Sequence, residues 1–189
     1  MINYSNISKG IEYYSKHNFK YIEVPWIVSE KVSNVTRPEG SNNIYLSGYE
    51  HLNGLCCLPA SGEQSFLQLV EKQTIKPGKY QTVTPCFRNE NTVWNHPHFL
   101  KLELFVYEVN YLTVSVTNLV EMCSKFFNSL GIETKVLKTG NNTFDIMSKS
   151  DIELGSYGGR YWLEQNVYWL YATGIAEPRT SQVIEMETK

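Results

Sequence analysis

The segment 99–107 alternates strictly between two kinds of side chain, and this pattern constrains the fold more than any other. The odd and even positions form two faces, Phe99, Lys101, Glu103 and Phe105 against Leu100, Leu102, Leu104 and Val106. A period of two predicts a β-strand with one apolar face. The run Tyr80–Phe87, rich in β-branched and aromatic residues, comes before it across a polar stretch with Asn, His and Pro. We therefore expect 80–108 to form an antiparallel hairpin with a long connection.

Charged residues lie on or beside these two strands, namely Arg88, Glu90, Lys101 and Glu103. An unpaired charge is costly at a half-buried position of a strand. Two interpretations follow: a solvent-facing edge hairpin with paired charges, or a polyanion site built on a sheet. We favour the site, because charged residues beside aromatic ones in a concave place suit a bound ligand.

Length and composition narrow the class of protein. A chain of 189 residues is long enough for one domain with a real core. The net charge of −2 and the absence of a basic run argue against nonspecific nucleic-acid binding. The four cysteines form no CxxC motif, so free thiols in a reducing compartment are expected. The N-terminus has no signal-peptide pattern and no apolar run reaches membrane length, which favours a cytoplasmic protein without membrane contact.

The rest of the chain mixes helical and strand patterns. Helical spacing predicts helices over 7–17, 64–73, 114–130 (ended by Gly131) and 179–186. Strands are expected over 19–28 (interrupted by Pro25), 44–49, 52–58, 132–137, 143–147 and 165–172. The segment 33–43 is rich in turn residues, and 151–160 is polar and glycine-rich. The order predicts an α+β fold, an antiparallel sheet flanked by helices.

Two short motifs near the hairpin could carry chemistry. In Phe87–Glu90 the Arg88 guanidinium could grip a phosphate through two parallel hydrogen bonds, and the Phe99 ring offers a face for a purine. His96 and His98 are either solvated loop residues or contacts to outer phosphates. In Leu58–Glu63, Ser61 is either a helix N-cap or a substrate contact, and Glu63 could pair with the ammonium group of an amino acid.

Two further motifs lie near the C-terminus. In Glu153–Arg160, Glu153 could hold a magnesium ion and the glycines would let a ligand approach the backbone; a plain polar loop is the alternative. In Thr173–Arg179, a glycine turn opens a helix with an arginine in its first turn, which can direct a guanidinium toward an anion or a base. That last pattern is common and weak alone.

Together these motifs resemble the catalytic core of the class II aminoacyl-tRNA synthetases. Phe19–Val28 resembles motif 1, PCFRNE followed by HFLKLELF resembles motif 2, and TGIAEPR resembles motif 3. LPASGE is similar to the threonine-x-glutamate loop of the seryl-type enzymes, with Ser61 in the threonine's place. IELGS is similar to the segment that binds magnesium-ATP and the amino acid, and ELGSYGGR also resembles ammonia-dependent asparagine synthetase. Amino acid–carrier protein ligases share this likeness.

The resemblance implies a role for each matching residue. ATP binding falls to Arg88, Glu90, His96, His98, Phe99, Glu153 and Arg179, with Arg88 and Arg179 catalytic, Glu153 holding Mg²⁺, and Phe99 and Arg179 enclosing the adenine. Amino-acid binding falls to Ser61, Glu63, Glu103 and Ser156.

The resemblance also implies an activity. We expect residues 1–189 to form one catalytic domain without an anticodon-binding domain, which activates an amino acid with ATP as an acyl-adenylate. The acceptor stays open among tRNA, a carrier protein, ammonia and a small molecule. The alternative is a non-catalytic paralogue that binds an amino acid or serves as a regulatory module. The resemblance also implies a homodimer that forms through Phe19–Val28.

Overall fold

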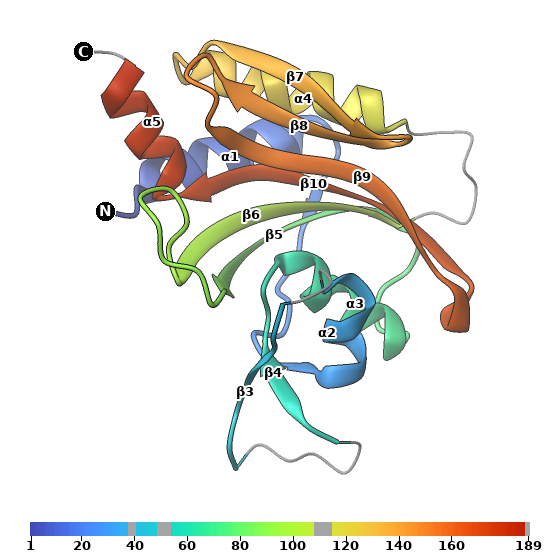
Figure 1. Cartoon of the computed structure of the whole chain (residues 1–189). Helices are drawn as coiled ribbons and strands as arrows, with labels where there is room; N and C mark the ends of the chain where they lie inside the picture. The colour runs from blue at the N-terminus through green and yellow to red at the C-terminus, as the bar shows by residue number, and fades with distance from the viewer. Residues whose placement is uncertain (38–40, 49–53, 108–114, 188–189) are drawn as a thin grey trace.

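A computed structural model describes residues 1–37, 41–48, 54–107 and 115–187 (Figure 1). The helices are α1 (Tyr4–Lys16), α2 (Glu30–Thr36), α3 (Gly62–Glu71), α4 (Val116–Ser129) and α5 (Arg179–Glu187), with a 3₁₀ turn η1 (Leu163–Gln165). The strands are β1 (Lys20–Tyr21), β2 (Val28–Ser29), β3 (Ile44–Tyr45), β4 (Cys56–Leu58), β5 (Gly78–Phe87), β6 (His98–Tyr107), β7 (Thr134–Gly140), β8 (Thr143–Ser148), β9 (Glu153–Trp162) and β10 (Val167–Glu177). Among the described helices, none is long and apolar enough to cross a membrane.

A seven-stranded sheet in the order β1-β5-β6-β10-β9-β8-β7 forms the centre of the molecule. All of its pairings are antiparallel except that of β1 with β5. The β5–β6 hairpin runs in register from Gly78 opposite Tyr107 to Phe87 opposite His98. The predicted α+β class and the predicted hairpin are therefore confirmed.

Helices cover the two faces of this sheet unequally (Figure 1). Even positions of β6 enter a core with α1 and α4, in which Leu102, Leu104 and Phe126 are buried. Odd positions face α3, where Phe66 stacks on Phe105 with ring centroids 4.8 Å apart. The alternation in the sequence thus assigns one side of β6 to the main core and the other to α3 and the candidate site.

The glycine-rich segment predicted as a polar piece is the full strand β9, paired with β8 and β10. Its glycines do not leave room for a ligand. A Cβ on Gly158 would meet the Tyr171 hydroxyl at 2.6 Å, and a Cβ on Gly159 would meet the Tyr168 hydroxyl at 2.1 Å. These glycines therefore let tyrosine side chains lie flat across the sheet, which corrects the expectation that a ligand approaches there.

The first part of the chain departs most from the prediction. The segment 19–28 contains only the short strand β1 before Pro25, and Val28 belongs to β2 in a separate sheet of order β2-β4-β3. A proline between them removes a ladder hydrogen bond, which accounts for the division. The start of the turn-rich segment 33–43 is helical, because α2 begins at the capping Ser29. The turn of the predicted 44–58 hairpin lies outside the described residues.

Candidate functional site

Strand register places three of the predicted site residues, Phe99, Glu103 and Ser156, on the α3-side face of the large sheet. Thr173 lies opposite Glu103, and Trp169 lies opposite Arg160. Because side chains alternate along a strand, Phe99, Lys101 and Glu103 of β6 share this face with Ser156 and Arg160 of β9. The face ends near residues 60–63, where α3 begins.

Arg88 connects the hairpin to the start of α3. Its Nε donates to the Ala60 carbonyl at 3.1 Å, and its guanidinium carbon lies 5.1 Å from the centre of the Phe99 ring. The Arg88 amide donates to Pro97 O at 2.9 Å, which closes the loop between the strands. The side chain is only partly buried, so its terminal nitrogens stay available to an anion.

Arg179, in the first turn of α5, reaches the same loop. Its Nε donates to Trp94 O and its Nη1 to Glu153 O, both at 3.1 Å, while Nη2 donates to Asn95 Oδ1. Its Nη1 also lies 3.6 Å from the Glu153 carboxylate. These contacts hold the guanidinium beside the tip of the hairpin loop.

The pKa of Arg179 shows which charges surround it. Burial lowers this pKa, and the Arg88 charge lowers it further, while Glu153 and Glu90 oppose the change. The charges of three other predicted ATP-site residues, Arg88, Glu90 and Glu153, therefore act on Arg179. Phe99 and Arg179 both line one small depression. Its lining residues are Trp94, His96, Phe99, Ala176, Glu177, Pro178 and Arg179.

The remaining residues of the predicted ATP set are held more loosely. His96 Nε2 lies 3.4 Å from Gln182 Oε1, at the edge of the depression. Glu90 and His98 are exposed, in the loop and at the start of β6 respectively. The structure brings Arg88, Phe99 and Arg179 together. His96, Glu90 and His98 lie at the rim of this group.

Ser61 and Glu103 form a buried polar group at the N-terminus of α3. Ser61 Oγ accepts from the Glu63 amide at 3.3 Å, which confirms the predicted N-cap, and donates to Glu103 Oε2 at 2.6 Å. Lys101 Nζ lies 2.8 Å from the same Glu103 oxygen. The other oxygen, Oε1, is buried and has no hydrogen-bond partner among the described residues. A buried acceptor of this kind has unused capacity for a donor.

The sequence predicts that Glu63 pairs with the ammonium group of an amino acid. In the structure, both of its carboxylate oxygens already accept hydrogen bonds from protein donors. Its Oε1 accepts from Trp169 Nε1 at 2.7 Å, and its Oε2 accepts from Arg160 Nη1 at 2.9 Å. Burial raises the pKa of Glu63 despite the opposing charge of Arg160. Both oxygens are committed to protein donors, so Glu63 holds Arg160 and Trp169 in place.

Two carboxylates, those of Glu153 and Asp145, lie at the other end of the same face. Glu153 is half-exposed beside Arg179, and Asp145 of β8 lies opposite Ser156 of β9. Burial raises the pKa of Asp145. Ser156 lowers this pKa, and the negative charge of Glu153 raises it. No cluster of three His, Cys, Asp or Glu occurs among the described residues. Two carboxylates suit Mg²⁺, which commonly takes one or two together with phosphate oxygens.

Sequence reasoning missed the parts of the site that depend on β9 and β10. Arg160, Trp169, Tyr171 and Asp145 had no assigned role, although each contacts or surrounds a predicted residue. Reading 153–162 as a strand would have placed Ser156 and Arg160 on one face. The three glycines in that segment concealed the signal.

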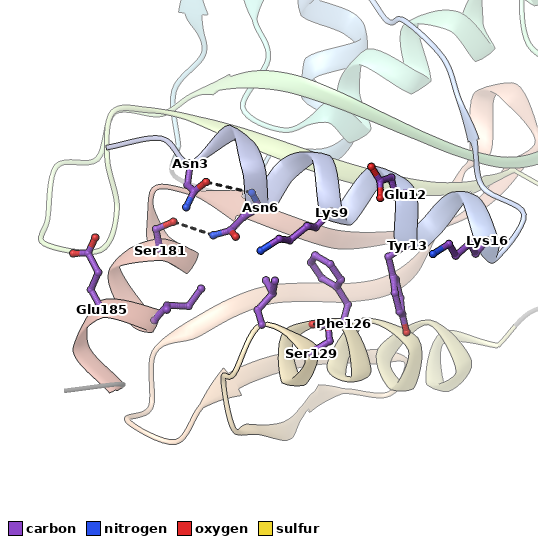
Figure 2. A pocket seen from close by; sticks show the side chains of 12 residues that line it. Asn3, Asn6, Lys9, Glu12, Tyr13, Lys16, Phe126, Ser129, Ser181 and Glu185 are labelled. Carbon is purple, nitrogen blue, oxygen red and sulfur yellow. Dashed lines mark hydrogen bonds between the residues drawn. The ribbon is translucent and has the colours of Figure 1, made fainter.

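A separate groove of about 500 Å³ lies on the opposite side of the sheet, between α1, α4 and α5 (Figure 2). Tyr13 and Phe126 line it, and Asn6 points toward Ser181 at one end. Asn6 also donates to the buried Glu177 at 3.3 Å. None of the predicted site residues lines this groove.

The amino-acid sequence matches no family model and no curated protein. Solved structures do match. The cytoplasmic serine–tRNA ligase of Naegleria fowleri, in complex with AMP, aligns with a TM-score of 0.74 and 17% identity over 94% of this chain and 47% of that one. The chain thus spans about half the length of that protein.

Two structures of the pyrrolysyl-tRNA synthetase of Desulfitobacterium hafniense also align. Their TM-scores are 0.71 and 0.69, at 18% and 17% identity, over 96% and 97% of this chain and 68% of each of theirs. At such identity the likeness concerns the fold alone. This chain has the fold of a class II aminoacyl-tRNA synthetase catalytic core, as the sequence motifs predict.

Proposed function

We propose that this protein activates an amino acid with ATP. A carboxylate oxygen of the amino acid attacks the α-phosphorus, the bond to the bridging oxygen breaks, and pyrophosphate leaves with that electron pair. The product is an aminoacyl-adenylate. Such a reaction needs positioning and charge neutralisation rather than a protein nucleophile.

The convergence of Arg88, Phe99 and Arg179 carries this proposal. The Arg88 guanidinium lies 5.1 Å from the Phe99 ring, and Phe99 and Arg179 line one depression. An aromatic face and two guanidiniums match a purine and its phosphates. The serine–tRNA ligase of similar fold was determined in complex with AMP, which supports nucleotide binding by a protein of this fold.

Other residues of the face receive matching roles. Glu103 Oε1, buried and unpaired among the described residues, would accept from the substrate ammonium. Glu153 with Asp145 beside it would hold Mg²⁺, which neutralises phosphate charge when bound. Arg88 would bind the substrate carboxylate and the α-phosphate, and Arg179 the opposite side of the nucleotide.

The decisive experiment is amino-acid-dependent exchange of labelled pyrophosphate into ATP, run with a full panel of amino acids. We expect at least one amino acid to support exchange. We expect Arg88→Ala to abolish it while the circular dichroism spectrum and the urea midpoint stay unchanged. Arg37→Ala is the matched control, because Arg37 caps the end of α2 and is not among the site residues, so this variant should keep full exchange. Full exchange in Arg88→Ala would refute the assignment of Arg88.

The second candidate is a non-catalytic module that binds an amino acid or a partner protein. It is favoured by one observation, namely that Arg179 already spends its donors on Trp94, Asn95 and Glu153. This candidate expects an amino acid to raise the melting temperature although no pyrophosphate exchange occurs.

We also propose a homodimer that forms through the Phe19–Val28 segment. Tyr21 and Trp26 are 43% and 60% exposed there, which is high for large apolar side chains close together in sequence. The acceptor of the activated amino acid, whether tRNA, a carrier protein, ammonia or a small molecule, would be identified by transfer assays with the purified adenylate.

A further inference from the structure

Arg160 is anchored at two points and open at a third. Its Nη1 donates to Glu63 Oε2 at 2.9 Å, and its guanidinium carbon lies 4.5 Å from the centre of the Tyr171 ring. Glu63 is 5% exposed, whereas the Arg160 side chain is 37% exposed. Its Nε and Nη2 have no hydrogen-bond partner among the residues that the structure describes. The guanidinium is thus fixed in orientation while part of its donor edge remains free.

This free edge belongs to the amino-acid end of the candidate site. Tyr171 lies under the guanidinium, and the groups that act electrostatically on its hydroxyl include Arg160, Glu63 and Lys101. Ser156 also lowers the pKa of this hydroxyl. Arg160 therefore shares one side of the sheet with Ser61, Glu103 and Ser156, the residues predicted to bind the amino acid.

The charged groups around Tyr171 form ion pairs. Burial raises the pKa of Tyr171, and Arg160 opposes that rise more strongly than Glu63 adds to it, with Lys101 acting in the same direction as Arg160. The neighbouring carboxylates have cationic partners already, Glu63 with Arg160 and Glu103 with Lys101. Glu63 contacts Arg160 at Nη1, so an anion at Nε and Nη2 would approach the guanidinium from the side away from this carboxylate.

From this arrangement we propose that Arg160 selects the side chain of the substrate, and that the substrate is a dicarboxylic amino acid. The inference rests on the proposed function and specifies its substrate class. With the α-carboxylate at Arg88 and the ammonium at Glu103, the side-chain carboxylate would receive the parallel N–H groups of Arg160. A carboxylate offers two acceptor oxygens to this fork, whereas a carboxamide offers one acceptor and a competing donor.

The test uses the whole chain with aspartate, glutamate, asparagine, glutamine and leucine. Pyrophosphate exchange and the shift in melting temperature are measured for each of them. We expect aspartate or glutamate alone to support exchange and to stabilise the protein. Exchange with leucine or with an amide, and not with a dicarboxylic acid, overturns this inference but keeps the proposed function. If no amino acid supports exchange, the proposed function fails. In that case, stabilisation by a dicarboxylic acid alone would still support the selectivity of Arg160. If no amino acid stabilises the protein either, the selectivity of Arg160 is overturned as well.

Two variants separate recognition from a structural role. Arg160→Met with Glu63→Gln removes the buried ion pair without leaving Glu63 as an unpaired charge. We expect this double variant to lose ~100-fold or more in kcat/KM for the dicarboxylic substrate, mainly through KM, with KM for ATP unchanged. Arg160→Lys should restore part of that loss. A double variant that folds as the wild type does and keeps its preference for the dicarboxylic acid would refute the assignment.

Discussion

Replacing Lys101 by Met tests the physical account of the buried group at the start of α3. Lys101 Nζ lies 2.8 Å from Glu103 Oε2, and the two side chains are 9% and 0% exposed. The replacement leaves Glu103 buried with Ser61 as its remaining described hydrogen-bond partner. Removing one member of a buried ion pair costs about 3–5 kcal/mol, because the other charge stays desolvated without compensation.

The assay is urea unfolding followed by circular dichroism at neutral pH, together with a thermal scan. For a chain of this length the expected cost corresponds to a fall of roughly 6–20 °C in melting temperature. The double variant Lys101→Met with Glu103→Gln should recover most of the loss, because no buried charge remains. That recovery would separate the electrostatic cost from the loss of the lysine side chain's packing.

Lys125→Met is the matched control for this prediction. Lys125 pairs with Glu121 at 2.7 Å, almost the same separation, but the two side chains are 65% and 66% exposed. Solvent screens such a pair, so we expect no measurable change in the free energy of unfolding. If Lys101→Met costs no more than Lys125→Met, burial is not what makes the Lys101–Glu103 pair important, and the reasoning is refuted.

Three further predictions concern other parts of the chain. Burial raises the pKa of Glu177, so the folded state holds the proton more tightly; the stability contributed by this group is full at low pH and is lost as pH rises through the folded pKa. In urea unfolding we expect the wild type to lose stability relative to Glu177→Gln as the pH rises above about 4, the ordinary pKa of a glutamate. A difference in unfolding free energy that does not change with pH would contradict this. A Cβ on Gly10 would lie 2.8 Å from Leu102 Cδ2, so Gly10→Ala should destabilise by about 1–3 kcal/mol although alanine favours helices. The exposed Ser8→Ala change in the same helix is its control, and equal unfolding midpoints would count against the packing argument. Trp26→Glu should convert the proposed homodimer to a monomer by light scattering, whereas a monomeric wild type would remove the proposal.

The sequence alone was sufficient for the elements whose pattern is periodic. Alternation over 99–107 predicted the strand β6 and which of its faces enters the main core, and helical spacing predicted α4. Ser61 was recognisable as a possible cap because a short hydroxyl side chain before a helix satisfies a backbone amide. The motifs that predicted the synthetase fold are local as well, since each lies in one short segment.

Tertiary structure decided what depends on neighbours that are distant in sequence. β9 forms a strand because β8 and β10 pair with it and tyrosine hydroxyls occupy the space beside its glycines, and neither contact can be read from a glycine-rich segment alone. The hydrogen bonds of the Glu63 carboxylate likewise depend on Arg160 and Trp169, which lie 97 and 106 positions further along the chain. A residue's type indicates which bonds it can make, whereas packing determines which of them are already made when a substrate arrives.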